Sequence, residues 1–392
     1  MGLLLKLLIC FLIIFLNSSS KLLGKDFDDI EISLITIGNG DELYSMFGHS
    51  ALRIKDLSSN PKNDLVYNFG VFDSRQPDFI YNFLSGDLNY FSTIEQYYPF
   101  IQSYLYEKRR ITELKLNLSS DKKEKIISLL NENFKPENLY YKYKPFSENC
   151  ATKIRDMIFH DEKIIFPNNE MTYRQTVNTI TANKPWVQLG INILMGINMD
   201  KPLNSTSAMF LPENLELATK NTLIAIETDN LTQHQSRSDK KMFSFFYNPN
   251  FIFFLLLGIS VFLSLSYSKN SIQILFVFDF ILFFIVGIIG GILGILSVWS
   301  KHDIFNTNLN ILWALPTHLI YAGFVNSPNR LANIYRLGSL TLILISIFVL
   351  LFQQKSEMVT MILIFLLLAF RLINHIKSSL NSSHNIISSS SL

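Results

Sequence analysis

The pattern of hydrophobic and polar positions divides the chain near residue 245. Before that point polar and apolar residues alternate in short runs, and after it long apolar runs dominate. The apolar segments that are about long enough to span a bilayer lie at 249–267, 272–298, 308–326, 337–353 and 357–374. A buried soluble bundle is a poor alternative, because runs such as "FIFFLLLGISVFLSLS" have no polar face for water. The pattern therefore predicts an all-α membrane domain of five helices over residues 246–376, followed by a polar tail at 377–392.

The N-terminus has the three parts of a secretory signal. Lys6 supplies positive charge, Leu7 to Leu16 form an apolar core, and "NSSS" supplies small residues for cleavage. We predict a signal peptide at residues 1–20, with a retained anchor as the alternative, because no clear A-x-A site follows. Cleavage would remove Cys10 and leave Cys150 as the single thiol of the mature chain, so no intramolecular disulfide is expected.

Basic residues in the connecting loops predict the orientation of the chain. With residues 25–245 outside, five basic residues fall on the inner side of the membrane and two on the outer side. The inner set is Lys269, Arg330, Arg336, Arg371 and Lys377, and the outer set is Lys301 and Lys355. This distribution follows the positive-inside rule and predicts a cytoplasmic C-terminus. The net charge of +2 gives no basic face for nucleic acid.

Two polar features stand out in the membrane half. Asp279 lies within the second predicted span, where an ionisable side chain usually faces the bundle interior, as a packing group or as a functional one. The loop "SKHDIFNTNLNILWALP" places His302 and Asn308 at the outer surface. It is either a solvated loop or a site beneath the soluble domain that a membrane-derived substrate would reach.

Residues 25–245 carry an α+β pattern. The runs "DIEISLITIGNG", "GHSALRIKD", "LVYNFGVFD" and "RITELKLNL" alternate like strands, and "SSDKKEKIISLLNENF" begins with a cap and continues as a helix. The aromatic stretch 79–106 is partly helical, and it either packs in the core or lines a path for lipid. A further helix is expected to begin at Cys150. The order of these elements predicts strands and helices within one domain.

Cys150 stands at the start of its predicted helix. Ser147 and Asn149 are capping candidates, and "CATKIRDMIF" continues with apolar residues at helical spacing. A thiol in the first turn lies at the positive end of the helix dipole, which lowers its pKa and favours the thiolate. The backbone N–H groups, with the Asn149 side chain as an addition, could hold a developing oxyanion. The alternative is a small buried apolar residue without a chemical role.

A thiol nucleophile needs a base, and His49 is the candidate. It follows a glycine at the start of a strand, from which its ring could project toward a helix N-terminus. His160 follows Cys150 on the same helix, about three turns away. Papain-like thiol enzymes pair a cysteine on a helix with a histidine on a strand, and here the histidine comes first. Asn68, on the expected neighbouring strand, could orient the imidazole, with Tyr67 as the alternative.

Several stretches resemble one known family. The runs "ISLITIGNGDELYSMFGHSALRIKD", "VYNFGVFD", "YYKYKPFSENCATKIRD", "PWVQLGINILMGINMDKP", "AMFLPENLELA" and "HDIFNTNLNILWALP" resemble the lipoprotein N-acyltransferase of Bacteroidetes-type bacteria. In that family a periplasmic domain long catalogued as of unknown function precedes a five-span membrane domain. The resemblance covers about residues 30–326, and the spans after residue 330 carry no motif of the family. It implies that Cys150 is the nucleophile and His49 its partner, and analogy with permuted NlpC/P60-like folds gives Asn68 the orienting role.

The resemblance implies a permuted papain-like (NlpC/P60-like) thiol-enzyme domain in the periplasm, anchored in the bacterial inner membrane. A fatty acyl chain would pass from a membrane phospholipid to Cys150 as a thioester, and then to the α-amine of a diacylglyceryl-cysteine lipoprotein, with His49 as base. The candidate substrate-binding residues are Arg109, Arg110, His302 and Asn308. The two arginines are either ligands for a phosphate headgroup or a solvated pair, and no cofactor or metal is expected. The alternatives are a membrane-anchored cysteine amidase or peptidase, and a non-catalytic membrane scaffold.

Overall fold

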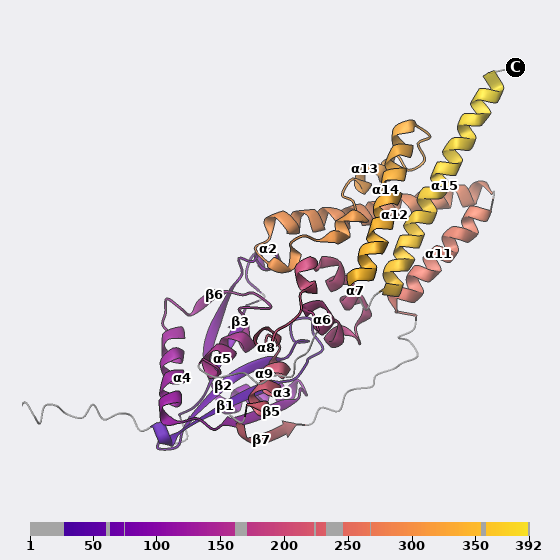
Figure 1. The fold of residues 1–392 in the computed structure, drawn as a ribbon. Coiled ribbons are helices and arrows are strands. Elements are labelled where there is room, and N and C mark those ends of the chain that lie inside the picture. Colours follow the sequence, from indigo (N-terminus) through magenta and orange to yellow (C-terminus); the bar gives the residue numbers. More distant parts are fainter. Residues whose placement is uncertain are drawn as a thin grey trace, which may run out of the picture.

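The computed structural model describes residues 27–59, 63–73, 75–160, 171–222, 225–232, 246–266, 268–353 and 358–390. An N-terminal domain of strands and helices is joined to a group of long apolar helices (Figure 1). The signal peptide predicted at residues 1–20 lies outside the described residues. The last described strand ends at Thr232 and the first long apolar helix begins at Pro249, on either side of the change in hydrophobic pattern near residue 245.

The N-terminal domain is built on one antiparallel sheet, with the strand order β6-β4-β3-β2-β1-β5-β7 in the described residues. The strands are β1 (Ile30–Ile37), β2 (His49–Asp56), β3 (Asp64–Val71), β4 (Asn89–Gln96), β5 (Ile111–Leu116), β6 (Tyr140–Lys142) and β7 (Ala225–Thr232). Successive residues of β1 point to opposite faces, so that Leu34 belongs to one core and Ile35 to the other. Both faces of the sheet therefore need a cover.

Helices supply that cover on both faces. They are α3 (Tyr97–Tyr106), α4 (Ser120–Asn133), α5 (Cys150–Ile158) and α9 (Pro212–Asn221). On one face, α4, α5 and α9 pack with Leu52 and Phe69, and Ile154 of α5 is fully buried there. On the other face, α3 packs against Ala51 and Val66. The α+β prediction is confirmed, although the aromatic stretch 79–106 also contains β4 between α2 (Phe79–Ser85) and α3.

A set of short helices connects the sheet domain to the apolar helices. They are α6 (Tyr173–Thr181), α7 (Pro185–Leu194), the 3-10 turn η3 (Ile197–Asp200) and α8 (Ser205–Ala208). Arg174, which is 1% exposed, holds them together. Its guanidinium pairs with Asp200 (2.6 Å) and donates hydrogen bonds to the carbonyls of Met195 (3.1 Å) and Gly196 (3.0 Å). These contacts fix the path of the chain toward the membrane half.

The apolar half contains α11 (Pro249–Leu265), α12 (Lys269–Trp299), α14 (Arg330–Gln353) and α15 (Met358–Ser390). Among the described residues, α12, α14 and α15 are long and apolar enough to cross a membrane, and α11 is shorter at 17 residues. The tail predicted as polar from residue 377 continues α15 as far as Ser390. The prediction of several apolar helices is confirmed.

The third predicted span, 308–326, is not one helix. It contains the 3-10 turn η5 (Leu309–Leu312) and the short helix α13 (His318–Gly323), with Pro316 between them. This segment packs closely against α12, because a Cβ on Gly290 would overlap the carbonyl of Ala314. An irregular backbone at membrane depth is tolerated where it is buried in protein, and here the glycines of α12 allow that burial.

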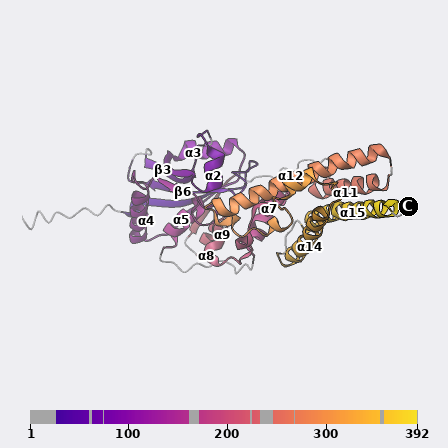
Figure 2. The same ribbon diagram turned by 90° about the horizontal axis from the view of Figure 1, so that it is seen from above.

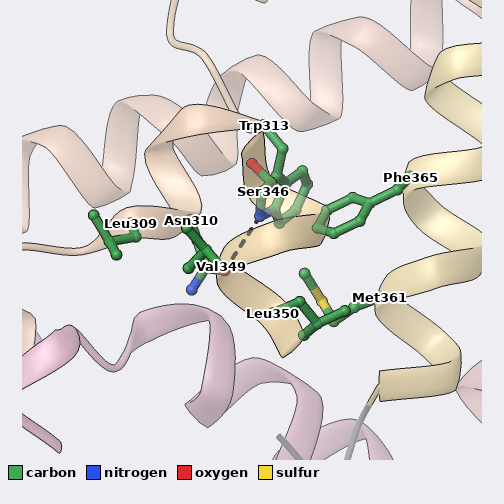
Figure 3. A pocket seen from close by; sticks show the side chains of 8 residues that line it. All are labelled: Leu309, Asn310, Trp313, Ser346, Val349, Leu350, Met361 and Phe365. Carbon is green, nitrogen blue, oxygen red and sulfur yellow. Dashed lines mark hydrogen bonds between the residues drawn. The ribbon is translucent and has the colours of Figure 1, made fainter. Parts of the chain in front are cut away.

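Little space remains where this segment meets α14 and α15 (Figure 3). The indole N–H of Trp313 donates to the side-chain oxygen of Asn310 (3.2 Å), and Phe365 of α15 packs beside it. The cavity between these residues measures about 10 Å³. That volume holds at most one water molecule, so it offers no room for an acyl chain.

Asp279 is one of three buried polar residues that join α12 to α15. Its carboxylate pairs with Arg371 through two hydrogen bonds (2.6 and 2.7 Å) and lies 3.0 Å from Nε2 of His375. Arg371 also donates to the hydroxyl of Ser264 in α11 (2.5 Å). Arg336, another basic residue of the inner set, is buried and donates to the carbonyls at 325 and 327. Two of the basic residues used to predict orientation are therefore also packing groups.

Candidate active site

α5 begins at Cys150, and a capping box fixes its first turn. The side chain of Asn149 accepts a hydrogen bond from the backbone N–H of Thr152 (2.9 Å), and the Thr152 hydroxyl accepts one from the backbone N–H of Asn149 (2.8 Å). Ala151 and Ile154 anchor the helix in the core. The thiol is thus held where the first backbone N–H groups of a helix have no partner within it.

Gly70 leaves space for this thiol at the end of β3. Its φ of +81° is one that residues with a side chain rarely adopt. A Cβ at this position would lie 3.6 Å from the Cβ of Cys150 and 3.7 Å from the hydroxyl of Tyr141. The register between β3 and β4 also shifts between Asn68 and Val71. The regular pairing of β3 with β4 is therefore interrupted at the point where Cys150 lies beside the sheet.

His49 is the first residue of β2, and the adjacent strand β3 supplies its partner. Nε2 of His49 lies 2.7 Å from Oδ1 of Asn68. The amide nitrogen of Asn68 donates to Glu95 of β4 (2.9 Å), which also accepts from Thr93 (2.8 Å), so the amide oxygen faces the imidazole. Nε2 therefore carries the proton, and Nδ1 is left to interact with Cys150.

The thiol and the imidazole shift each other's protonation. Burial opposes the charge on His49, but attraction to Cys150 and hydrogen bonds that the ring donates to Cys150 and Asn68 outweigh it and raise the pKa of His49. Burial alone would raise the pKa of Cys150, yet the charge and hydrogen bond of His49 and the backbone N–H groups of Ser50 and Ala151 lower it. The pair consequently favours a thiolate beside an imidazolium.

Tyr104 and Arg109 form the wall behind the imidazole. Tyr104 of α3 stacks on His49 with 6.2 Å between ring centroids, and the guanidinium of Arg109 lies 5.1 Å from the centre of the Tyr104 ring. Arg109 is buried and donates two hydrogen bonds to the carbonyl of Gly38 (2.9 and 2.8 Å). Its buried guanidinium supports the wall of the site, and the alternative of a solvated arginine pair does not hold for Arg109.

Of the two roles that the sequence suggested for Asn149, the structure confirms the helix cap and leaves no donor for the oxyanion. Its oxygen caps α5, and its amide nitrogen donates to the carbonyls of Pro145 (2.7 Å) and Phe210 (2.8 Å). No N–H of this side chain is left for an oxyanion. Tyr67, the alternative third residue, lies on the other face of the sheet and packs against Phe134.

Tyr141 of β6 is the residue that the sequence reasoning missed. Its hydroxyl is buried beside Gly70 and makes no hydrogen bond of good geometry with a described side chain or backbone group. Burial raises its pKa, so it stays a proton donor. The signal in the sequence was its place in "YYKYKPFSENC", nine residues before the cysteine.

The other predicted substrate-binding residues lie outside this arrangement. Arg110 pairs with Glu216 (3.1 Å) and Glu213 (3.4 Å). His302 contacts the carbonyl of Phe83 through Nε2 (2.8 Å), and Asn308 donates to the carbonyls at 193 and 194 (2.8 and 2.9 Å). His302 and Asn308 thus join the outer loop to α2 and α7. His160 lies beyond the end of α5 and is exposed.

Comparison with known families gives a match for each half of the molecule. Residues 24–180 match the family model described as the Lnb N-terminal periplasmic domain, and residues 240–382 match the Lnb transmembrane domain. No curated protein and no solved structure gives a significant match. The two matches lie on either side of the boundary seen in the structure, in the order that the sequence resemblance implies.

Proposed function

We propose that this chain, which belongs to the Lnb family, is a lipoprotein N-acyltransferase that uses Cys150 as its nucleophile. The family matches make it a membrane protein with a periplasmic domain. The observation that carries the proposal is the series Cys150, His49, Asn68: a thiol at a helix start, a base that interacts with it, and a third group that fixes the base. A cysteine on a helix and a histidine on a strand also support a permuted papain-like fold.

The location of the site supports a lipid as acyl donor. A periplasmic site has no supply of acyl-CoA or ATP, whereas phospholipid esters are abundant in the adjoining membrane. The domain is fixed to α12 by short hydrogen bonds, including one from the Ser300 hydroxyl to the carbonyl of Leu84 (2.6 Å). The positive-inside distribution supports the inner membrane and a cytoplasmic C-terminus.

In the first half-reaction, the thiolate of Cys150 attacks the carbonyl carbon of a phospholipid ester. The tetrahedral oxyanion would accept hydrogen bonds from the Tyr141 hydroxyl and the first backbone N–H groups of α5. As the C–O bond breaks, the imidazolium of His49 protonates the departing alkoxide. The products are a lysophospholipid and an acyl thioester on Cys150, and no electrons are exchanged with a cofactor.

In the second half-reaction, the acceptor is the α-amine of a diacylglyceryl-cysteine at a lipoprotein N-terminus. Such an amine has a pKa of about 8, so part of it is already neutral and nucleophilic. It attacks the thioester carbon, the C–S bond breaks, and His49 takes up the proton that the amine loses. The amide forms and the Cys150–His49 ion pair is restored, which gives ping-pong kinetics.

Mass spectrometry of the purified full-length protein tests the proposal. Wild-type protein from membranes is expected to carry a fatty acyl group on Cys150 that hydroxylamine releases and that a diacylated lipopeptide removes, and Cys150→Ala is expected to carry none. Absence of the adduct, together with equal triacylation of lipoproteins in cells with either version, would exclude the acyltransferase. Peptide hydrolysis by the wild type alone would instead favour the amidase.

A further inference from the structure

α2 and the outer end of α12 border an apolar hollow that is open to the surface. Its volume is about 610 Å³, and its walls are Tyr81, Gly294, Ile295, Val298 and Trp299. The rings of Tyr81 and Trp299 meet with 4.7 Å between centroids. A Cβ on Gly294 would have only one described side chain near it, at 3.7 Å. The missing side chain at this glycine therefore keeps part of the hollow open.

Polar contacts hold α2 in place against α12, and the two elements lie side by side in both views of the ribbon (Figures 1 and 2). Besides the bond from Ser300 to α2, the backbone N–H of Lys301 donates to the carbonyl of Ser85 (2.8 Å), and His302 contacts the carbonyl of Phe83 (2.8 Å). The bonds to Leu84 and Ser85 pair carbonyls at the end of α2 that lack a partner within the helix, and the carbonyl of Phe83 accepts from Gly86 as well as contacting His302. The hollow is therefore a fixed feature of the junction between the two domains.

The rim of the hollow continues the lipid-facing surface of α12. Val298 is 89% exposed, Ile80 is 71% exposed and Ile295 is 61% exposed. Exposed apolar side chains at the end of a membrane-spanning helix are covered by lipid, and Tyr and Trp are typical of the boundary between lipid and water. None of the lining residues is charged, so a charged headgroup would find no countercharge inside, and the side-chain polar groups of the lining are the Tyr81 hydroxyl and the Trp299 indole N–H.

A row of aromatic rings leads from α2 toward the thiol. Phe79 packs on Phe72 with 5.6 Å between centroids, Phe72 on Tyr90 at 5.3 Å, and Tyr90 on Tyr143 at 4.2 Å. Burial, and after it the negative charge of Cys150, raise the pKa of Tyr143, which places that ring within electrostatic reach of the sulfur. The row thus runs from α2, whose Tyr81 lines the hollow, to Tyr143 near the nucleophile.

We propose that the hollow between α2 and α12 binds one fatty acyl chain of the donor phospholipid, with the chain lying along the aromatic row and its ester at Cys150. This inference rests on the proposed function. An acyl chain is the occupant that fits, because the walls are apolar and continuous with the lipid-facing surface of α12. We therefore expect the hollow to select for chain length, because a six-carbon chain with its ester at Cys150 extends less far along the aromatic row than a sixteen-carbon chain.

The first test fills the hollow with Gly294→Phe and uses Gly291→Phe as its matched control. A Cβ on Gly291 meets nothing, so this variant adds the same ring to the same helix outside the hollow. With full-length protein in detergent micelles, Gly294→Phe is expected to slow thioester formation from dipalmitoyl phosphatidylethanolamine about tenfold or more. With the dihexanoyl donor, the rate of thioester formation by Gly294→Phe should differ from that of the wild type by less than about threefold. The rate of Gly291→Phe should also differ by less than about threefold with either donor. Equal behaviour of the two variants with the long donor overturns the inference, and retained activity with the short donor shows that Gly294→Phe is folded.

The second test does not depend on catalysis. Cys150→Ala protein in vesicles is irradiated with a phosphatidylethanolamine that carries a diazirine at the end of one acyl chain. Crosslinks are expected on the peptides that contain Tyr81 and Trp299, and Gly294→Phe should remove them while Gly291→Phe does not. Label spread evenly over the lipid-facing helices overturns the acyl-chain site.

If the label concentrates at the hollow but the wild type never forms a thioester, the proposed function fails while the lipid site stands. If the wild type forms the thioester but no label concentrates at the hollow, the lipid site fails while the proposed function stands.

Discussion

Each half of the molecule places a histidine within a buried polar group, but the two groups differ in what is left unpaired. In the membrane half, Asp279, Arg371 and His375 are 1%, 3% and 8% exposed, and the carboxylate is matched by the guanidinium through two hydrogen bonds. In the periplasmic half, His49 is fixed by Asn68 on one side and faces a half-buried thiol on the other.

This difference separates a structural group from a reactive one. A carboxylate and a guanidinium that satisfy each other inside a bundle hold helices together and have no capacity left for a substrate. A thiolate at a helix start is stabilised by N–H groups but keeps its nucleophilic electron pair available. Substitution of one group at a time therefore separates an effect on acyl transfer from an effect on folding.

The largest effect on chemistry is expected for Cys150→Ser. A hydroxyl beside His49 is a far poorer nucleophile than the thiolate, so acyl transfer should fall about 10⁴-fold or more. The melting temperature of the full-length protein should stay close to that of the wild type, because the two side chains are nearly equal in size. Lipoprotein triacylation in cells measures the first quantity and thermal unfolding in detergent the second. Full activity of the variant would remove the thiol from the mechanism.

The largest effect on folding is expected for Asp279→Ala. It leaves the guanidinium of Arg371 buried without its carboxylate, which costs about 3–5 kcal/mol. The double variant Asp279→Leu with Arg371→Leu removes both charges and should recover much of the lost stability. Thermal unfolding of the three purified proteins measures the free-energy differences. If Asp279→Ala instead keeps its melting temperature and fails to form the thioester, the membrane group takes part in the chemistry.

Tyr141→Phe tests the oxyanion donor and should have a smaller effect than loss of the nucleophile. Removal of one such donor lowers kcat about 10²–10³-fold. Because the ring remains, its packing should persist, and the rate of Cys150 alkylation by iodoacetamide should change little. The comparison of acyl transfer with alkylation separates transition-state stabilisation from activation of the thiol. A parallel loss of both would give Tyr141 a role in activating the thiol.

The pH dependence of alkylation reports the ion pair directly. The pKa of Cys150 is lowered, so its thiolate should react with iodoacetamide at a pH below the usual thiol midpoint of about 8.5. His49→Ala removes the positive charge that stabilises the thiolate and should move the midpoint upward, and Asn68→Ala should move it in the same direction by less. Acyl transfer should lose rate at low pH as Cys150 is protonated, and at high pH as the imidazolium of His49, whose pKa is raised, loses its proton. An unchanged midpoint in His49→Ala would separate the two residues.

The parts of the site that the sequence predicted depend on local signals. A cap followed by apolar residues at helical spacing places Cys150 at a helix start, and strand alternation places His49 and Asn68 on neighbouring strands, as their geometry now shows. The cap formed by Asn149 was predicted, but the engagement of its amide nitrogen could not be, because that nitrogen donates to the carbonyl of Phe210, which lies 61 positions further along the chain. Tyr141 was missed because its role also depends on a contact between residues far apart in the sequence. Only the folded structure shows that its hydroxyl lies beside Gly70, close to Cys150.

In the membrane half, the path of a whole predicted span also depends on contacts between residues far apart in the sequence. Apolar content alone predicts a span at 308–326, and that segment is as apolar as a helix requires. Its irregular path depends on contacts that composition does not reveal: the glycine at 290 that meets Ala314, and the bonds from Asn308 to α7. The polar loop, which the sequence left as a solvated loop or a substrate site, bonds to α2 and α7 in the structure and so contacts the other domain.

Asn308→Ala is expected to give the smallest effect. It distinguishes a role of Asn308 in joining the two domains from a role in binding substrate. The substitution leaves the carbonyls of Ile193 and Leu194 without this donor, and loss of such buried bonds costs about 1–3 kcal/mol. If Asn308 joins the domains, the melting temperature falls while KM for phospholipid stays the same. If it binds substrate, KM rises and the melting temperature holds. Lys301→Ala is the matched control, because its ammonium pairs with Asp87 on the exposed side of the same loop, where water and salt screen the interaction, so neither quantity should change.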